Sequence, residues 1–117
     1  MRIAANIAIA FVALEHFWIL VLEMFLWTKP LGRRTFGLTP ELAQASKVLA
    51  MNQGLYNGFL GAGLIWSLVA GNRSVAIFFL ICVIVAGVFG AFTAKRTILW
   101  VQAAPAVAAL LLEVFAA

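Results

Sequence analysis

The chain has 117 residues, of which 66% are hydrophobic and 10% are charged, whereas soluble domains are about half apolar and roughly a quarter charged. This composition excludes an ordinary water-soluble surface and indicates a single domain in a lipid bilayer. The net charge is +4, but the basic residues lie at the ends of apolar segments, so we expect no nucleic-acid partner. Cys82 is the single cysteine, which excludes an internal disulfide.

Four apolar stretches are long enough to cross a membrane, which takes about 20 helical residues. They cover residues 3–27, 48–70, 74–94 and 97–115. Very short connections join the second stretch to the third and the third to the fourth, so these neighbours must be antiparallel. The sequence therefore predicts an all-α fold, an integral membrane four-helix bundle with up-down-up-down order, formed by residues 1–117 as one transmembrane domain.

The longest connection, residues 28–47, carries a turn signal at Lys29-Pro30 and a helix start at Thr39-Pro40-Glu41. A hydroxyl N-cap, a proline at the first helical position and a carboxylate near the positive end of the helix dipole favour this start. We therefore expect the second helix to have an amphipathic beginning near Pro40, outside the membrane, and to enter the bilayer after Lys47.

The distribution of basic residues predicts the orientation in the membrane. The side that bears connections 28–47 and 95–96 carries Lys29, Arg33, Arg34, Lys47, Lys95 and Arg96. The opposite side carries only Arg2 and Arg73. Because cytoplasmic loops are enriched in Lys and Arg, we expect both of these connections in the cytoplasm and both termini outside.

Small residues recur at a spacing of four in two of the stretches. Gly54 and Gly58 form one pair, and Gly87 and Ala91 form another. Such pairs let helix backbones approach closely in a bilayer. Packing within the chain is the simpler interpretation, and a homo-oligomer formed through either pair stays open. Pro105 predicts a kink in the fourth stretch.

Three titratable residues interrupt the first apolar stretch: Glu15, His16 and Glu23. Such side chains are costly in a membrane unless they are paired, hydrated or neutral, so they indicate a functional site. His16 and Glu23 are seven residues apart and share a face, separated by ~10 Å along the axis, and Glu15 lies about 100° around the helix. Because none can pair with another along this helix, each needs a partner from elsewhere.

Depth along the helices suggests where these partners come from. Glu23 lies ~7 Å from the cytoplasmic end of its stretch at 1.5 Å per residue. Asn52 and Gln53 in the second stretch and Gln102 in the fourth reach a similar depth, and Asn57 lies one turn further in. We therefore predict that Glu23, Gln53, Asn57 and Gln102 converge.

Two further residues have simpler interpretations. Trp18 lies at mid-span, where it forms either core or the wall of a pocket. Glu113 lies near the outer end of the fourth stretch, where we expect its carboxylate to reach the headgroups as an interface residue.

Two motifs carry a resemblance to a known family. The first is Asn52-Gln53-Gly54-Leu55-Tyr56-Asn57-Gly58, and the second is Glu15-His16 followed by Leu22-Glu23-Met24. With them, nearly the whole chain resembles a family of small bacterial membrane proteins catalogued as domain of unknown function 1304. The resemblance implies a four-helix integral membrane protein, here of the bacterial inner membrane. The resemblance implies no particular reaction. The residues to which it points are Glu15, His16, Glu23, Asn52, Gln53, Tyr56 and Asn57.

Three functions stay open on these observations, and whether the protein is an enzyme stays open with them. The first is a site that binds or converts a lipophilic small molecule, since a carboxyl removed from water tends to stay protonated and can act as an acid. Glu23 would be the acid and His16 the base, with Asn57, Gln53 and Tyr56 orienting the ligand. Membrane lipids are the other expected partners.

The second function is a proton-coupled transporter or channel subunit, in which His16 and Glu23 relay protons within an oligomer. The third is a structural or accessory membrane subunit, in which internal hydrogen bonds would satisfy all of these polar groups. We expect neither a cofactor nor a metal, because Glu15, His16 and Glu23 lack the i, i+3 or i, i+4 spacing that metal-binding helices favour.

Overall fold

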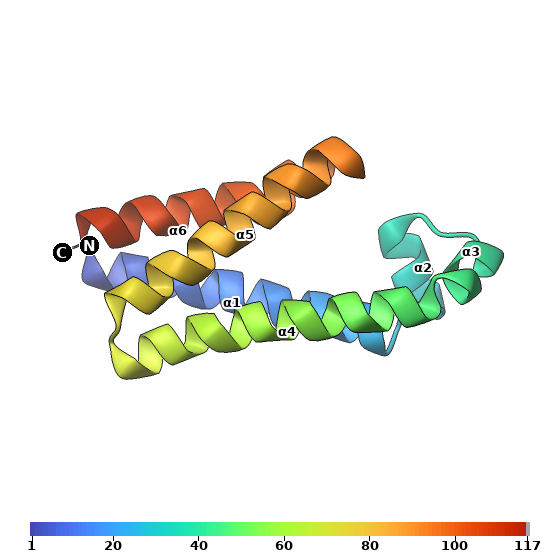
Figure 1. The fold of residues 1–117 in the computed structure, drawn as a ribbon, viewed down its shortest axis with the longest axis horizontal. Helices are drawn as coiled ribbons and strands as arrows, with labels where there is room; N and C mark the ends of the chain where they lie inside the picture. The colour runs from blue at the N-terminus through green and yellow to red at the C-terminus, as the bar shows by residue number, and fades with distance from the viewer. Residues whose placement is uncertain (117) are drawn as a thin grey trace. The chain divides into compact units, whose positions relative to one another are not determined.

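A computed structural model describes residues 1–116, and most of this part of the chain is helical (Figure 1). The longer helices are α1 (Arg2–Met24), α4 (Lys47–Ala70), α5 (Arg73–Thr93) and α6 (Ala104–Phe115). Two short helices, α2 (Pro30–Phe36) and α3 (Pro40–Ala45), lie between α1 and α4, and a π-helical segment, η1 (Leu99–Ala103), leads directly into α6. No strand occurs in residues 1–116, and the predicted all-α class is confirmed.

Two helices, α1 and α5, are long and apolar enough to cross a membrane. The segment Leu99–Phe115, made of η1 and α6, is a shorter apolar helix. Each of the four predicted stretches therefore contains a helix, with α4 in the second. A bundle of four membrane-spanning helices stays a prediction.

The chain divides into two compact units. Unit 1 comprises Met1–Leu14 and Leu60–Ala117, and unit 2 comprises Glu15–Phe59. α1 and α4 each contribute residues to both units, whereas α5, η1 and α6 belong to unit 1 and α2 and α3 to unit 2.

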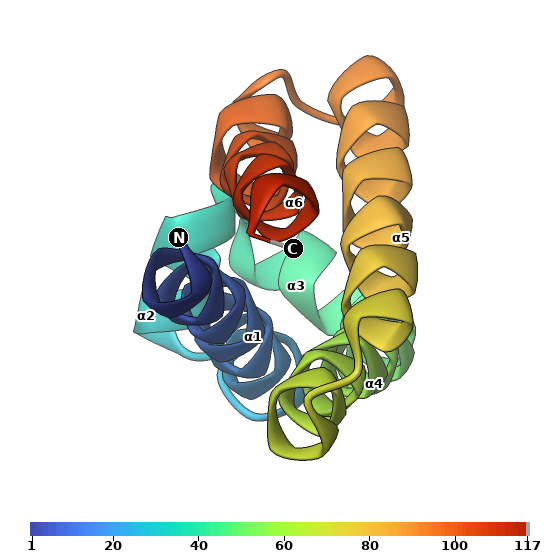
Figure 2. The same ribbon diagram turned by 90° about the vertical axis from the view of Figure 1, so that its left-hand side faces the viewer.

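Small and branched apolar side chains form the core of unit 1. The buried residues are Ile9, Val12, Ala13, Leu64, Ala76, Leu80, Val83, Ala106 and Ala109. α5 and α6 run beside each other (Figure 2), and the lack of a side chain on Gly87 lets α5 approach η1. A Cβ at Gly87 would lie 3.0 Å from both the Cβ and the backbone nitrogen of Ala103. Small residues thus allow the close packing on which helix association in lipid depends.

In unit 2 the chain turns after α1 over residues 25–29, close to the predicted position, and then forms a short helix that was not predicted. α2 begins at Pro30, in the segment where the sequence predicted a turn at Lys29-Pro30. Gly32 lets α2 fold back onto the end of α1, since a Cβ at this position would lie only 1.9 Å from the carbonyl oxygen of Leu26. Proline at a first helical position and glycine in left-handed conformation at the C-cap, Gly37 (φ 65°), bound the helix.

The predicted helix start at Thr39-Pro40 is confirmed, but the helix that begins there is short. Thr39 Oγ1 accepts a hydrogen bond of 3.1 Å from the backbone nitrogen of Leu42, as an N-cap does. α3 ends at Ala45, and Ser46 adopts φ −102° and ψ 7° before α4 begins at Lys47. The expected single helix from Pro40 into the second stretch is therefore two helices.

Ser46 joins three segments of unit 2 through its hydroxyl group. Ser46 Oγ donates to the carbonyl oxygen of Leu42 at 2.7 Å and accepts from Trp27 Nε1 at 3.0 Å. The Trp27 ring also packs against Phe36 of α2, with ring centroids 4.9 Å apart. These contacts fix the break between α3 and α4 against the residues that follow α1.

The fourth stretch contains a π-helical turn just before the proline that predicted a kink. Ala104 donates its backbone N–H to the carbonyl oxygen of Leu99, five residues earlier, and Pro105 lies in the first turn of α6. Because η1 runs directly into α6, the missing N–H of Pro105 leaves the carbonyl oxygen of Val101 without its usual α-helical donor. The chain accommodates Pro105 by widening one turn ahead of it, and π-turns of this kind are often found at functional sites.

Candidate functional site

Glu15, His16 and Glu23, the titratable residues in the second half of α1, all lie in unit 2, and they differ in burial. His16 is 1% exposed, whereas Glu15 and Glu23 are partly buried. The heptad spacing places His16 and Glu23 on one side of α1, ~10 Å apart along the axis, as expected. The second half of α1 therefore carries one buried imidazole and two partly buried carboxyls among apolar side chains.

Glu23 is hydrogen-bonded to Asn57 of α4. Asn57 Nδ2 donates to Glu23 Oε1 at 2.6 Å. Two glycines make room for this contact: a Cβ on Gly54 would lie 2.6 Å from Met24 Cγ and 3.1 Å from Glu23 Cβ, and one on Gly58 would lie 2.5 Å from a methyl of Leu20. The small residues of α4 thus bring its backbone close to α1 and place Asn57 within reach of Glu23.

Glu15 has a buried oxygen, Oε1, without a hydrogen-bond partner. Leaving a buried polar atom unsatisfied costs about 1–3 kcal/mol. Native proteins rarely keep such a group unless a water, an ion or a ligand supplies the missing partner. Glu15 Oε1 is therefore the position in this region where an added hydrogen-bond donor would be most favourable.

The other polar residues of the second stretch do not gather around Glu23. Asn52, Gln53 and Tyr56 are exposed. Asn52 Nδ2 donates back to the carbonyl oxygen of Val48 at 2.9 Å, and the Tyr56 ring lies 6.3 Å from that of Phe59. In the described part of the chain, Asn57 is the one predicted amide that is hydrogen-bonded to Glu23.

Two predicted binding residues lie outside this contact. Trp18 is half-exposed on α1. Gln102 is partly buried in η1 and belongs to unit 1, whereas Glu23 belongs to unit 2. The convergence of Gln102 with Glu23 stays a prediction.

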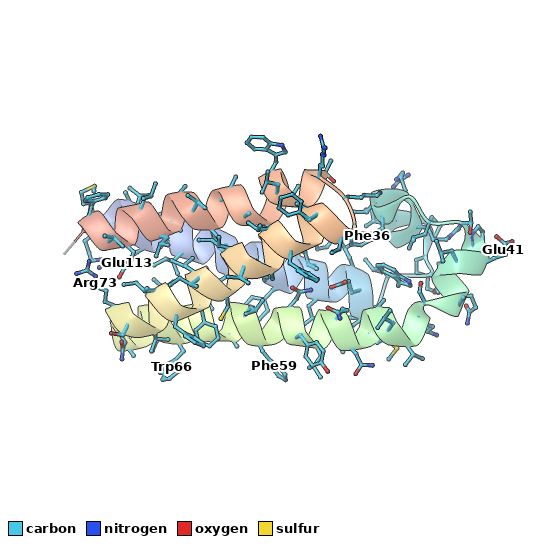
Figure 3. All side chains as sticks on the ribbon, turned by 45° about the horizontal axis from the view of Figure 1, so that its top comes forward. Phe36, Glu41, Phe59, Trp66, Arg73 and Glu113 are labelled. Carbon is cyan, nitrogen blue, oxygen red and sulfur yellow. The ribbon has the colours of Figure 1, made fainter. Side chains whose placement is uncertain are left out.

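Glu113 is a functional candidate that the sequence interpretation missed. Its side chain is 2% exposed and forms an ion pair with Arg2, so the carboxylate is buried in the protein and, contrary to the expectation, does not extend to the headgroups. Figure 3 shows Glu113 near Arg73, at the end of α6 and the start of α5. The antiparallel order of the stretches was the available signal, because it brings the start of the first and the end of the fourth to the same side.

Metal binding finds no support in the residues that the structure describes. No group of three or more His, Cys, Asp or Glu side chains in residues 1–116 could hold a metal ion. The α1 site offers carboxyl, imidazole and amide groups, which can accept hydrogen bonds, donate them and move protons.

Comparison with known proteins adds a family but no activity. Residues 10–114 match the family model described as "Protein of unknown function (DUF1304)". An uncharacterized protein of Lactococcus lactis subsp. lactis (strain IL1403), YpaA, is 34% identical over 119 residues, which cover 98% of this chain and 100% of that protein. No solved structure matches the chain.

Proposed function

Because the chain belongs to the DUF1304 family of proteins of unknown function, we propose its function from the α1 site. We propose that it is an integral membrane protein that binds a lipophilic small molecule through Glu15, His16 and Glu23. The observation that carries the proposal is the buried, unpartnered Oε1 of Glu15. The ligand is expected to carry a hydroxyl or amine group that donates to this oxygen.

The surface supports the membrane location. Large apolar side chains are exposed on α1, α4 and α5, among them Ile3 at 75%, Val69 at 84% and Phe92 at 87%. Figure 3 shows the side chains of Phe59 and Trp66 pointing away from α4. Soluble monomers rarely expose contiguous apolar patches of more than a few hundred Å². Lipid tails are the environment in which such a surface has no cost.

The contacts around Glu23 support acid–base chemistry at the same site. The Asn57 amide holds Oε1 of the Glu23 carboxyl and leaves Oε2 for the ligand. Glu23 would give its proton to the ligand, and His16, which is buried on the same face of α1 two turns away, would take a different proton from the ligand. Whether the ligand is converted or only bound depends on this pair, with Glu23 as acid and His16 as base.

The proposal is tested by native mass spectrometry of the protein extracted from its own membrane. We expect the wild-type protein to retain a small lipophilic molecule and Glu15→Leu to lose it. The leucine removes the acceptor together with its unsatisfied oxygen, so the variant should fold at least as stably as the wild type. Glu41→Leu, at an exposed position of α3, is the matched control and should retain the molecule.

Two results would contradict this function. One is wild-type protein that carries no small molecule under conditions that preserve its lipids, and the other is Glu15→Leu protein that carries the same molecule as wild type. Once the molecule is identified, His16→Ala and Glu23→Gln separate binding from conversion. If both variants bind it and turn it over as the wild type does, the acid–base assignment is wrong.

A further inference from the structure

A second polar site lies in unit 1, distinct from the α1 carboxyls and imidazole. It is a cavity of about 100 Å³ between the first turns of α1, the turn from α4 to α5, and the end of α6. Its polar lining consists of Arg2, Asn6, Ser67, Asn72, Arg73 and Glu113. The proposed function uses none of these residues.

Of the two arginines that line this cavity, Arg73 has no carboxylate partner in the part of the chain that the structure describes. Glu113 is buried and paired with Arg2, which satisfies one guanidinium. Arg73 Nη2 donates to the carbonyl oxygen of Val114 at 2.6 Å, but Arg73 Nε is buried and has no hydrogen-bond partner. Among residues 1–116, one positive charge and one buried N–H donor therefore stay uncompensated at the cavity.

The amides that line the cavity have their acceptor atoms in use. Asn6 Oδ1 accepts from Arg2 Nε at 3.2 Å, and Asn72 Oδ1 accepts from the backbone nitrogen of Val75 at 3.2 Å, as the N-cap of α5. The Nδ2 amides of both asparagines and Nε of Arg73 remain as donors, while the Ser67 hydroxyl donates to the carbonyl oxygen of Leu64 at 2.6 Å. A lining of donors with a net positive charge suits an anion.

We propose that this cavity binds a phosphate group, with Arg73 Nε and the two asparagine amides as donors. A water molecule occupies about 30 Å³ of liquid, so about 100 Å³ gives room for a group of phosphate size. Guanidinium groups bind phosphate oxygens through directed, charge-assisted hydrogen bonds. The cavity lies where apolar helices end, which is the depth of lipid headgroups if the protein spans the membrane as proposed.

Two sources can supply this phosphate, the headgroup of an anionic phospholipid or free phosphate. The test uses the full-length protein, exchanged into an uncharged, phosphate-free detergent. Short-chain phosphatidylglycerol is titrated in one arm and inorganic phosphate in the other, and binding is followed by native mass spectrometry and isothermal calorimetry. If the lipid binds saturably and inorganic phosphate does not, the headgroup is the source. If both bind, free phosphate is sufficient to occupy the cavity.

Arg73→Gln is the informative variant, because it removes the unpaired donor and leaves the Arg2–Glu113 pair intact. A hydrogen bond to a charged group predicts a loss of affinity of about ten- to a hundredfold. Arg96→Gln removes the same charge from the exposed connection between α5 and η1 and should bind as the wild type does. Arg73→Lys keeps the charge but lacks the Nε donor, so it should fall between them.

The proposal is overturned if wild-type protein binds neither probe, or if Arg73→Gln and Arg96→Gln bind equally well. Should Arg73→Gln fail to fold, Asn6→Ala decides the question, since Asn6 is exposed and its loss should weaken binding several-fold. Wild-type affinity in Asn6→Ala would then count against the site. Neither substitution touches Glu15, so this proposal and the proposed function can fail separately.

Discussion

Replacing Asn57 with alanine removes the amide that donates to Glu23 Oε1 across 2.6 Å. Replacing Glu23 with leucine removes the acceptor, and the double variant removes both. Because the two residues are in direct contact, the free energies of unfolding of the single variants should not add. Hydrogen bonds between helices in a membrane show coupling energies that average near 0.6 kcal/mol and reach about 1.7 kcal/mol. Because the distance between Asn57 Nδ2 and Glu23 Oε1 is short, we expect a coupling energy in the upper half of this range, at about 1 kcal/mol.

Gln53 provides the matched control for this cycle. It lies one turn before Asn57 on α4 and carries the same amide group, but it is exposed. Glu23→Leu combined with Gln53→Ala should therefore be additive within about 0.3–0.5 kcal/mol. All variants are unfolded reversibly in mixed micelles with increasing SDS, and helicity is followed by circular dichroism. Additivity for Asn57, or coupling for Gln53, would refute the contact that the structure shows.

Two further substitutions test the short helices of unit 2 by thermal unfolding in micelles. Gly32→Ala should destabilise the protein by about 1–3 kcal/mol or more, because the added Cβ would lie 1.9 Å from the Leu26 carbonyl oxygen; unchanged stability would contradict the close approach of α2. Thr39→Ala should cost about 1 kcal/mol, because it removes the N-cap of α3. Thr35→Ala is its control, since Thr35 Oγ1 only donates back to Leu31 within α2, and an equal loss in both variants would argue against the cap.

The helices were predictable from hydropathy because apolar runs of that length leave few alternatives to helix. The positions where helices begin and end were harder to predict. Thr39-Pro40 marks a start through local chemistry alone, and the structure confirms it. The end of α3 at Ala45 depends on Ser46, whose hydroxyl is held by Trp27 from a distant part of the chain. Local patterns carry no information about such a contact.

The candidate site shows the same limit. Helical spacing alone places His16 and Glu23 on one face of α1, because that relation lies within one helix. The choice of Asn57 over Gln53 as the partner of Glu23 depends on how α4 is rotated against α1. That rotation depends on Gly54 and Gly58, whose lack of a side chain leaves room for Met24 and Leu20. The depth of a residue along its helix gives no information about this rotation.

The π-helical turn at Leu99–Ala103 changes the direction in which side chains before it point relative to those of α6. A helical wheel drawn for one regular α-helix would not show this change. Each extra residue in a helix turns what precedes it by about 100°. The direction of the Trp100 side chain, which is 72% exposed, therefore cannot be predicted from the spacing of buried residues in α6. A member of the family with one residue fewer in this turn could keep the packing of α6 and present its aromatic ring to a different neighbour. The turn is thus a place where insertion or deletion can redirect Trp100 without rotating α6.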